Sequence, residues 1–163
     1  MEKNRNYGIR IKLDKEVDKV IRYRFGDGSD YIRLSLHSVV GQVFAASSQK
    51  IMYQHYLPAH HESGGILFEF AGNELTGRFL PSEKVPRVKR LLYYIVLEEL
   101  RVTCEAFRGM GQSDYNAVKF FCAKYGITEN DIAQETLRKR IREWERKIAE
   151  KNVKKSSALL GAF

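Results

Sequence analysis

The sequence predicts an α+β fold, in which antiparallel β-hairpins with a covering helix precede a helical C-terminal module. Two stretches, within residues 8–36 and 66–80, alternate apolar and polar side chains with the period of a half-buried strand. Residues 87–148 instead place apolar side chains three or four positions apart, which is the period of a helix. Of the 163 residues, 44% are apolar, so a packed core is expected.

The first hairpin is predicted after an initial strand at residues 8–13. Its arms are residues 20–25 and 31–36, and the turn is the GDGSD segment at 26–30. An alternative is a strand followed by a helix from Asp14, as in a ribbon-helix-helix arrangement. We prefer the hairpin because both arms keep a strict period of two.

The outer face of this hairpin would carry Arg22, Arg24, Tyr31 and Arg33. Arginines beside an aromatic ring can bind single-stranded nucleic acid, with phosphates on the guanidinium groups and a base on the ring. An antiparallel sheet that packs on the core with one face carries the same residue types on its other, solvent-exposed face. We prefer this ordinary solvated face.

A helix is predicted from Ser38 to Tyr56, ended by Pro58 and covering the sheet, and a second hairpin joins residues 66–70 to 75–80. The intervening loop gathers several potential metal ligands. These are His55, His60, His61 and Glu62. Their spacing matches no metal or catalytic motif, so we expect no metal, no other cofactor and no catalytic residue.

The best boundary candidate is PSEKVP, residues 81–86, because its two prolines interrupt both periodicities. We therefore predict a sheet-and-helix module at 1–82, a basic helical module at 86–151 and a C-terminal tail at 152–163. The helix at 87–107 is so apolar that it is either a core helix, which we prefer, or the contact of a homodimer.

The helical module continues with a helix that Ser113 caps and Gly126 ends. Thr128 and Asp131 then have the spacing of a capping box, which predicts a short helix at 129–133 and a longer one from Gln134. The apolar stripe of the longer helix consists of Leu137, Ile141, Trp144 and Ile148.

This pattern resembles the helix-turn-helix class in outline, over about forty residues. The resemblance implies that the later helix enters the major groove of DNA. Glu135 departs from it, since such units bury an apolar residue at the corresponding position if Gly126 is the turn glycine. The predicted nucleic-acid-binding residues are Gln134, Thr136, Arg138, Lys139, Arg140, Arg142, Arg146, Lys147 and Lys151.

Charge favours the same function. Residues 137–155 hold nine Lys and Arg against three Glu, a net charge of +6 in a chain whose total is +8. A patch of this kind attracts nucleic acid because each neutralised phosphate releases condensed counterions. A solvated helix with ion pairs between successive turns is the alternative explanation.

We therefore expect a non-catalytic protein that binds nucleic acid, with duplex DNA favoured, as a regulator or a mobile-element accessory factor. The alternative is a structural or adaptor protein that uses its apolar helices and C-terminal tail. Cys104 and Cys122 are expected to be reduced core residues. No segment reaches the roughly 20 apolar residues of a membrane span, and a cytoplasmic location is expected.

Overall fold

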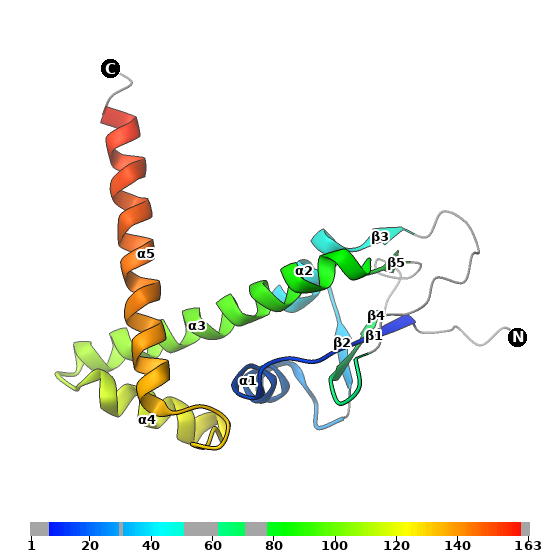
Figure 1. The fold of residues 1–163 in the computed structure, drawn as a ribbon, viewed down its shortest axis with the longest axis horizontal. Coiled ribbons are helices and arrows are strands. Elements are labelled where there is room, and N and C mark those ends of the chain that lie inside the picture. The colour runs from blue at the N-terminus through cyan, green and yellow to red at the C-terminus, as the bar shows by residue number, and fades with distance from the viewer. Residues whose placement is uncertain (1–6, 30, 51–61, 71–77, 161–163) are drawn as a thin grey trace, which may run out of the picture. The chain divides into compact units, whose positions relative to one another are not determined.

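In a computed structural model of the protein, the structure describes residues 7–29, 31–50, 62–70 and 78–160. The chain forms two compact units, residues 1–96 and 97–163, which divide within a single helix, α3 (Val85–Gly109). Figure 1 shows the order of the elements along the chain. Sheets in the first unit and a wholly helical second unit confirm the α+β class. The predicted division at 82–86 stays a prediction.

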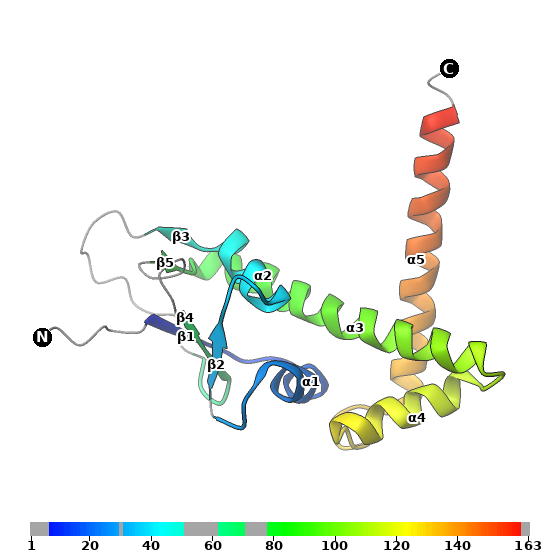
Figure 2. The same cartoon turned by 180° about the vertical axis from the view of Figure 1, so that it is seen from behind.

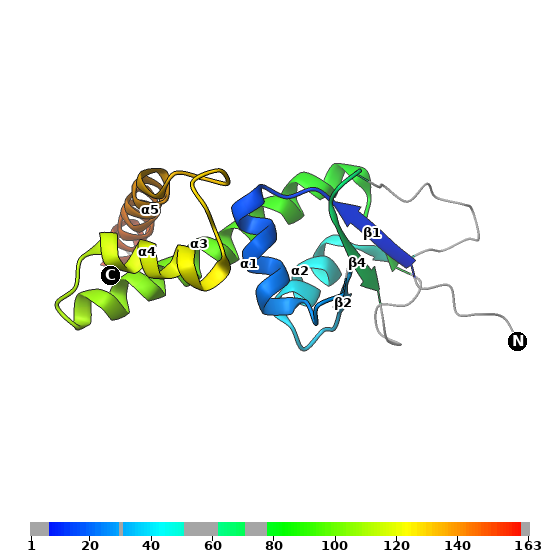
Figure 3. The same ribbon diagram turned by 90° about the horizontal axis from the view of Figure 1, so that it is seen from below.

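The sheet of the first unit has three strands in the order β1 (Tyr7–Ile11), β4 (Ile66–Phe70) and β2 (Tyr31–Leu34). β1 runs antiparallel to β4, and β2 runs parallel to it. Figure 3 shows β4 between its two neighbours. Two short strands, β3 (Gln49–Lys50) and β5 (Arg78–Phe79), form a separate antiparallel pair.

One face of the three-stranded sheet forms the core of this unit. Its inward side chains are Ile9, Ile11, Ile32, Leu34, Ile66, Phe68 and Phe70, all buried. Helices α1 (Lys15–Phe25) and α2 (Val39–Ser47) supply further buried apolar residues, as does the first half of α3. The Phe44 ring of α2 lies 4.7 Å from that of Phe68, which fixes α2 against β4.

Residues 20–25 form the end of α1 rather than a strand, so the first predicted hairpin is wrong. Val17, Val20 and Ile21 are buried at helical spacing, whereas Tyr23 is 62% exposed. The alternation of Ile21, Tyr23 and Phe25 therefore did not reflect two faces of a strand. The alternative prediction, a helix that follows Asp14, is correct for this segment, because Asp14 is the N-cap of α1.

The pairing of the second predicted hairpin is also wrong, although β4 itself is confirmed. β5 pairs with β3, while β4 lies between β1 and β2. The helix predicted at 38–56 is confirmed only as α2, which ends at Ser47 before β3. His55, His60 and His61 lie outside the described residues. The Glu62 carboxylate accepts from the backbone N–H of Lys12 at 2.6 Å.

Gly41 allows α2 to begin close to the end of β2. A Cβ at this position would lie 1.9 Å from the carbonyl oxygen of Ser35. The Ser38 hydroxyl caps the helix by accepting from the Gly41 N–H at 3.0 Å. The close approach and the cap together fix the turn between β2 and α2.

The second unit contains the end of α3, α4 (Asp114–Tyr125) and α5 (Gln134–Leu160). α4 folds back along α3 after a sharp turn, as Figure 2 shows from behind. The Ser113 cap is confirmed, and Gly126 ends α4 with the left-handed φ of 63° that glycine adopts most readily. The buried side chains of α4 and α5 are Ala117, Val118, Phe121, Cys122, Tyr125, Leu137 and Ile141.

The short helix predicted at 129–133 is a single hydrogen-bonded turn instead. Asp131 donates its backbone N–H to the Thr128 carbonyl, and its carboxylate accepts from the Thr128 N–H at 2.7 Å. The capping contact therefore forms, but too few residues follow before α5 for a helix to propagate.

Both cysteines are free and buried, Cys104 on α3 and Cys122 on α4, as predicted. Burial raises the pKa of the Cys104 thiol to about 11 and also raises the pKa of Cys122. None of the helices within the described ranges is both long and apolar enough to cross a membrane.

Candidate nucleic-acid interface

All nine predicted nucleic-acid-binding residues lie on α5, because the whole segment from Gln134 is helical. The helix is anchored by the predicted apolar stripe. Leu137 and Ile141 are buried, and Trp144 and Ile148 are half-buried. Successive residues of a helix are rotated by about 100°. The basic residues between these apolar positions must therefore project from the flanks or from the outer side of the helix.

Arg108, near the end of α3, fixes the start of α4 and the middle of α5. Its Nε donates to the Asp114 carboxylate at 2.7 Å, and its Nη1 donates to the Glu145 carboxylate at 2.8 Å. The terminal Nη2 reaches a second oxygen of each carboxylate, at 3.0 and 3.1 Å. These charge-assisted bonds join three helices through one side chain.

The electrostatics agree with this geometry. The Arg108 hydrogen bonds hold the pKa of the Asp114 carboxyl below its usual value, and Arg142 and Arg138 lower it further. The pKa of Arg108 is raised by the same two carboxylates. Arg138 and Arg142 therefore lie on the flank of α5 that faces the start of α4.

Arg138 is partly engaged within the protein. Its Nη1 donates to the Glu135 carboxylate at 2.7 Å, and its guanidinium carbon lies 5.9 Å from the centre of the Tyr115 ring. The side chain is half-buried, as is that of Arg140. Both arginines therefore contribute to the folded structure, which makes them less available to a ligand than the sequence alone suggested.

The remaining cations of α5 point into solvent. Lys139, Arg142, Arg146, Lys147 and Lys151 are all exposed. Arg146 lies 3.8 Å from Glu150, one turn further along. The other four form no ion pair with any residue that the structure describes. We call these four side chains, Lys139, Arg142, Lys147 and Lys151, the open cations.

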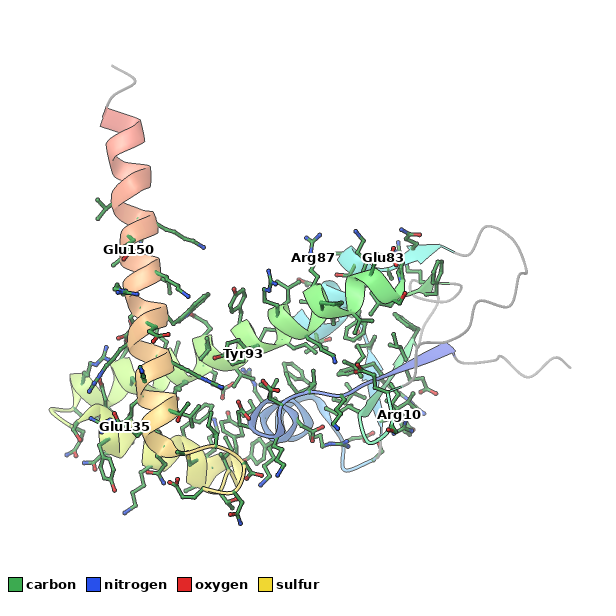
Figure 4. The ribbon with its side chains drawn as sticks, in the orientation of Figure 1. Arg10, Glu83, Arg87, Tyr93, Glu135 and Glu150 are labelled. Carbon is green, nitrogen blue, oxygen red and sulfur yellow. The ribbon has the colours of Figure 1, made fainter. Side chains whose placement is uncertain are left out.

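The outer side of α5 is not uniformly basic. Glu135, Glu143 and Glu150 are exposed among the cations, and Figure 4 labels the first and the last of them. A phosphate backbone that approached this side would meet carboxylates as well as cations. Contact would therefore involve a few defined phosphates rather than a broad charged surface.

The two neutral candidates for base contacts differ in accessibility. Gln134 is half-buried, and its backbone N–H points to the Glu129 carboxylate at 3.5 Å. Thr136 is exposed on the first turn of α5. Thr136 is thus the better placed of the two to reach a ligand.

Sequence reasoning missed Arg108, which organises the helices around the site. Its partner Glu145 is 37 positions away, and no sequence motif connects the two.

Among the described residues, no group of three or more His, Cys, Asp or Glu side chains is arranged to hold a metal ion. Comparison of the chain with models of protein families, with curated protein sequences and with solved structures finds no match.

Proposed function

We propose that this is a non-catalytic nucleic-acid-binding protein that contacts duplex DNA through α5, as a regulator or a mobile-element accessory factor. The observation that supports this function best is the set of four open cations. Lys139, Arg142 and Lys147 project from the flanks or the outer side of a helix whose other side is anchored in a hydrophobic core. Lys151 continues the line of Leu137 and Trp144, beyond the buried part of the helix. A binding partner can therefore use their charge without breaking an ion pair recorded in the structure.

The dimensions of a helix suit this role. An α-helix fits into the major groove of B-DNA, where side chains on its outer side can reach phosphates on either wall. In this proposal Lys139 and Arg142 contact the backbone at the start of α5, with Thr136 directed to base edges. Lys147 and Lys151 follow the backbone further along.

Charge neutralisation supplies the affinity. Each phosphate contact releases counterions, so the logarithm of the binding constant falls by roughly 0.9 per contact for each tenfold rise in salt. With few specific side chains on the outer face, most of the binding free energy is independent of base sequence. Sequence selectivity would then rest on Thr136.

The test replaces Lys139, Arg142 and Lys147 together with glutamine, which keeps helix propensity and removes three open cations. Arg138 and Arg140 are left in place because both are partly buried. Binding to a 30-base-pair duplex is measured by fluorescence anisotropy at 50 mM salt. We expect at least a tenfold loss of affinity with an unchanged circular dichroism spectrum.

A matched control removes three exposed cations elsewhere. Arg87, Arg90 and Lys119 are exposed and lie on α3 and α4. Replacing them with glutamine lowers the net charge by the same amount. Equal loss of affinity in both triple variants would show that binding follows total charge and would refute the assignment to α5.

A second candidate function, a protein-binding adaptor, is favoured by one observation. Met110 is 63% exposed and Phe120 is 51% exposed, and the Phe120 ring lies 5.4 Å from that of Phe107. Phe107 and Phe120 therefore form a partly exposed apolar contact between α3 and α4, and Met110 directly follows α3. Sedimentation of the wild type and of Phe120→Ser distinguishes the functions: a mass that rises with concentration only in the wild type, without duplex binding, would favour the adaptor.

A further inference from the structure

The outer face of the three-stranded sheet carries side chains in two rows that cross all three strands. Arg10 of β1 lies opposite Leu67 of β4, which lies opposite Tyr31 of β2. The neighbouring row contains Gly8, Glu69 and Arg33 in the same strand order. The strand register therefore brings Arg10, Tyr31 and Arg33 onto one face of the sheet. The sequence had instead predicted Tyr31 and Arg33 on a hairpin with Arg22 and Arg24, which lie on α1.

Tyr31 and Arg33 contact each other within this face. The guanidinium carbon of Arg33 lies 5.4 Å from the centre of the Tyr31 ring, and its Nη2 donates to the Tyr31 hydroxyl at 3.1 Å. Its Nε lies 3.4 Å from a carboxylate oxygen of Glu69. Three contacts thus hold the guanidinium group in place, while the Arg33 side chain stays 64% exposed.

Leu67 is the apolar residue of β4 on this face. It is half-buried and lies opposite Tyr31 in the strand register. Gly8 leaves room for its side chain, since a Cβ there would lie 2.9 Å from Cδ1 of Leu67. An apolar side chain beside a guanidinium group and an aromatic ring is a suitable contact for the face of a nucleobase.

The charge of this face suits an anionic chain. Arg10 and Arg33 belong to its two rows, and Lys12 lies directly after the end of β1. Glu69 is the acidic residue of the two rows, and Arg33 already pairs with it. The Arg10 guanidinium, labelled in Figure 4, donates to the Gly65 carbonyl at 2.9 Å and keeps further N–H groups available.

We propose that this sheet face binds single-stranded nucleic acid, independently of α5. A base stacks on the Arg33 and Tyr31 pair and over Leu67, and the adjoining phosphates contact Arg10 and Lys12. Glu69 can accept from an N–H of the bound base, such as the N3–H of thymine or uracil. Duplex would bind poorly here because its bases are already stacked on one another.

The test measures the anisotropy of fluorescein-labelled oligo-dT and oligo-U of twelve nucleotides with the full chain at 50 mM salt. Stacking on an aromatic or guanidinium group is worth about 5- to 150-fold in affinity per base. Arg33→Ala should therefore weaken binding within this range. Arg33→Lys should weaken it nearly as much, because lysine keeps the charge but lacks the planar group. The relative affinity of the two oligomers shows whether DNA or RNA is preferred.

Three further variants keep the proposal open to refutation. Tyr31→Phe keeps the ring and should bind almost as the wild type does, whereas Tyr31→Ala should not. Tyr23→Ala removes an exposed ring from α1 of the same unit and should have no effect. Wild-type protein that binds neither oligomer, or Arg33→Ala that binds both unchanged, would overturn the proposal.

These experiments distinguish single-strand binding by the sheet face from the duplex binding proposed for α5. Single-strand binding that is weakened only by the triple variant of Lys139, Arg142 and Lys147 would place both activities on α5 and refute the sheet site. Loss of duplex binding in that variant, with single-strand binding intact, would support both proposals. Single-strand binding without any duplex binding would support the sheet site alone.

Discussion

Replacing Arg108 with glutamine should measurably loosen the second unit, because this one side chain joins three helices. Arg108 bonds to Asp114 of α4 through two nitrogens and to Glu145 of α5 through two as well. Glutamine keeps part of the aliphatic stem and a hydrogen-bond donor but removes the charge. Both carboxylates then lose the cation that lies between them.

The size of the effect follows from exposure and geometry. The Arg108 side chain is 41% exposed, so solvent screens its ion pairs. The free energy that each pair contributes is therefore in the range of surface ion pairs. Such pairs contribute roughly 0.2–1 kcal/mol, with bidentate arginine–carboxylate geometry at the upper end. Two bidentate pairs therefore predict that Arg108→Gln lowers the free energy of unfolding by about 1–2 kcal/mol.

The effect should also depend on pH. The pKa of Asp114 is lowered in the folded state by its bonds to Arg108. Its stabilising contribution is therefore complete above the unfolded pKa of about 3.9 and is lost as pH falls through the lower folded value. The stability difference between wild type and Arg108→Gln should be constant from pH 7 to about 5 and should shrink below about pH 4.

Urea unfolding followed by circular dichroism at several pH values measures both quantities. Arg101→Gln is the matched control, because Arg101 also pairs with two carboxylates, Glu98 and Glu105, but within α3 alone. Pairs within one helix contribute about 0.3–0.5 kcal/mol each. The reasoning is wrong if Arg108→Gln costs no more than this control, or if its cost is unchanged at pH 3.

Two further predictions concern the core. Gly41→Ala should destabilise the protein by at least about 2 kcal/mol in urea unfolding, because its Cβ would overlap the Ser35 carbonyl. Gly109→Ala, where a Cβ meets nothing within 4 Å, should not be destabilising, and an equal loss in both would contradict the steric explanation. Cys104 and Cys122 should resist iodoacetamide at pH 8 in the native protein and react in urea, because burial raises both thiol pKa values. Rapid native labelling, measured by mass spectrometry, would show that the thiols are accessible.

The parts of the fold that the sequence could predict are those decided locally. Ser113 and Gly126 bound α4 as expected, because a cap and a left-handed glycine act within a few residues of the helix end. The stripe that begins with Leu137 and Ile141 was equally visible from its spacing. Long helices with strong signals at both ends depend little on the rest of the chain.

The pairing of the strands could not be predicted in this way. β2 pairs in parallel with β4, which is more than thirty residues later, so no turn sequence identifies the partner. Residues 20–25 alternate as a strand does, yet they form the end of α1, whose Val17 and Val20 are buried at helical spacing. Tertiary packing outweighed the local pattern there.

The candidate site was predictable in its position but not in its detail. Counting charges located the basic helix, and the spacing of its apolar residues indicated which side would be buried. The sequence did not indicate that Arg138 lies over Tyr115 or that Arg108 bonds to Glu145, since both contacts join separate helices. These contacts decide which cations remain available to a ligand.

The most direct test of the central claim is the salt dependence of duplex binding. We would measure the dissociation constant for a random 30-base-pair duplex between 50 and 200 mM salt, with wild type and with the glutamine triple variant of Lys139, Arg142 and Lys147. Four phosphate contacts by the open cations predict that the logarithm of the dissociation constant rises with the logarithm of the salt concentration with a slope of about 3.6, and the variant should lose about 2.7 of this slope. No binding by the wild type at 50 mM salt, or a variant with the wild-type slope, would contradict a role for α5 in binding DNA.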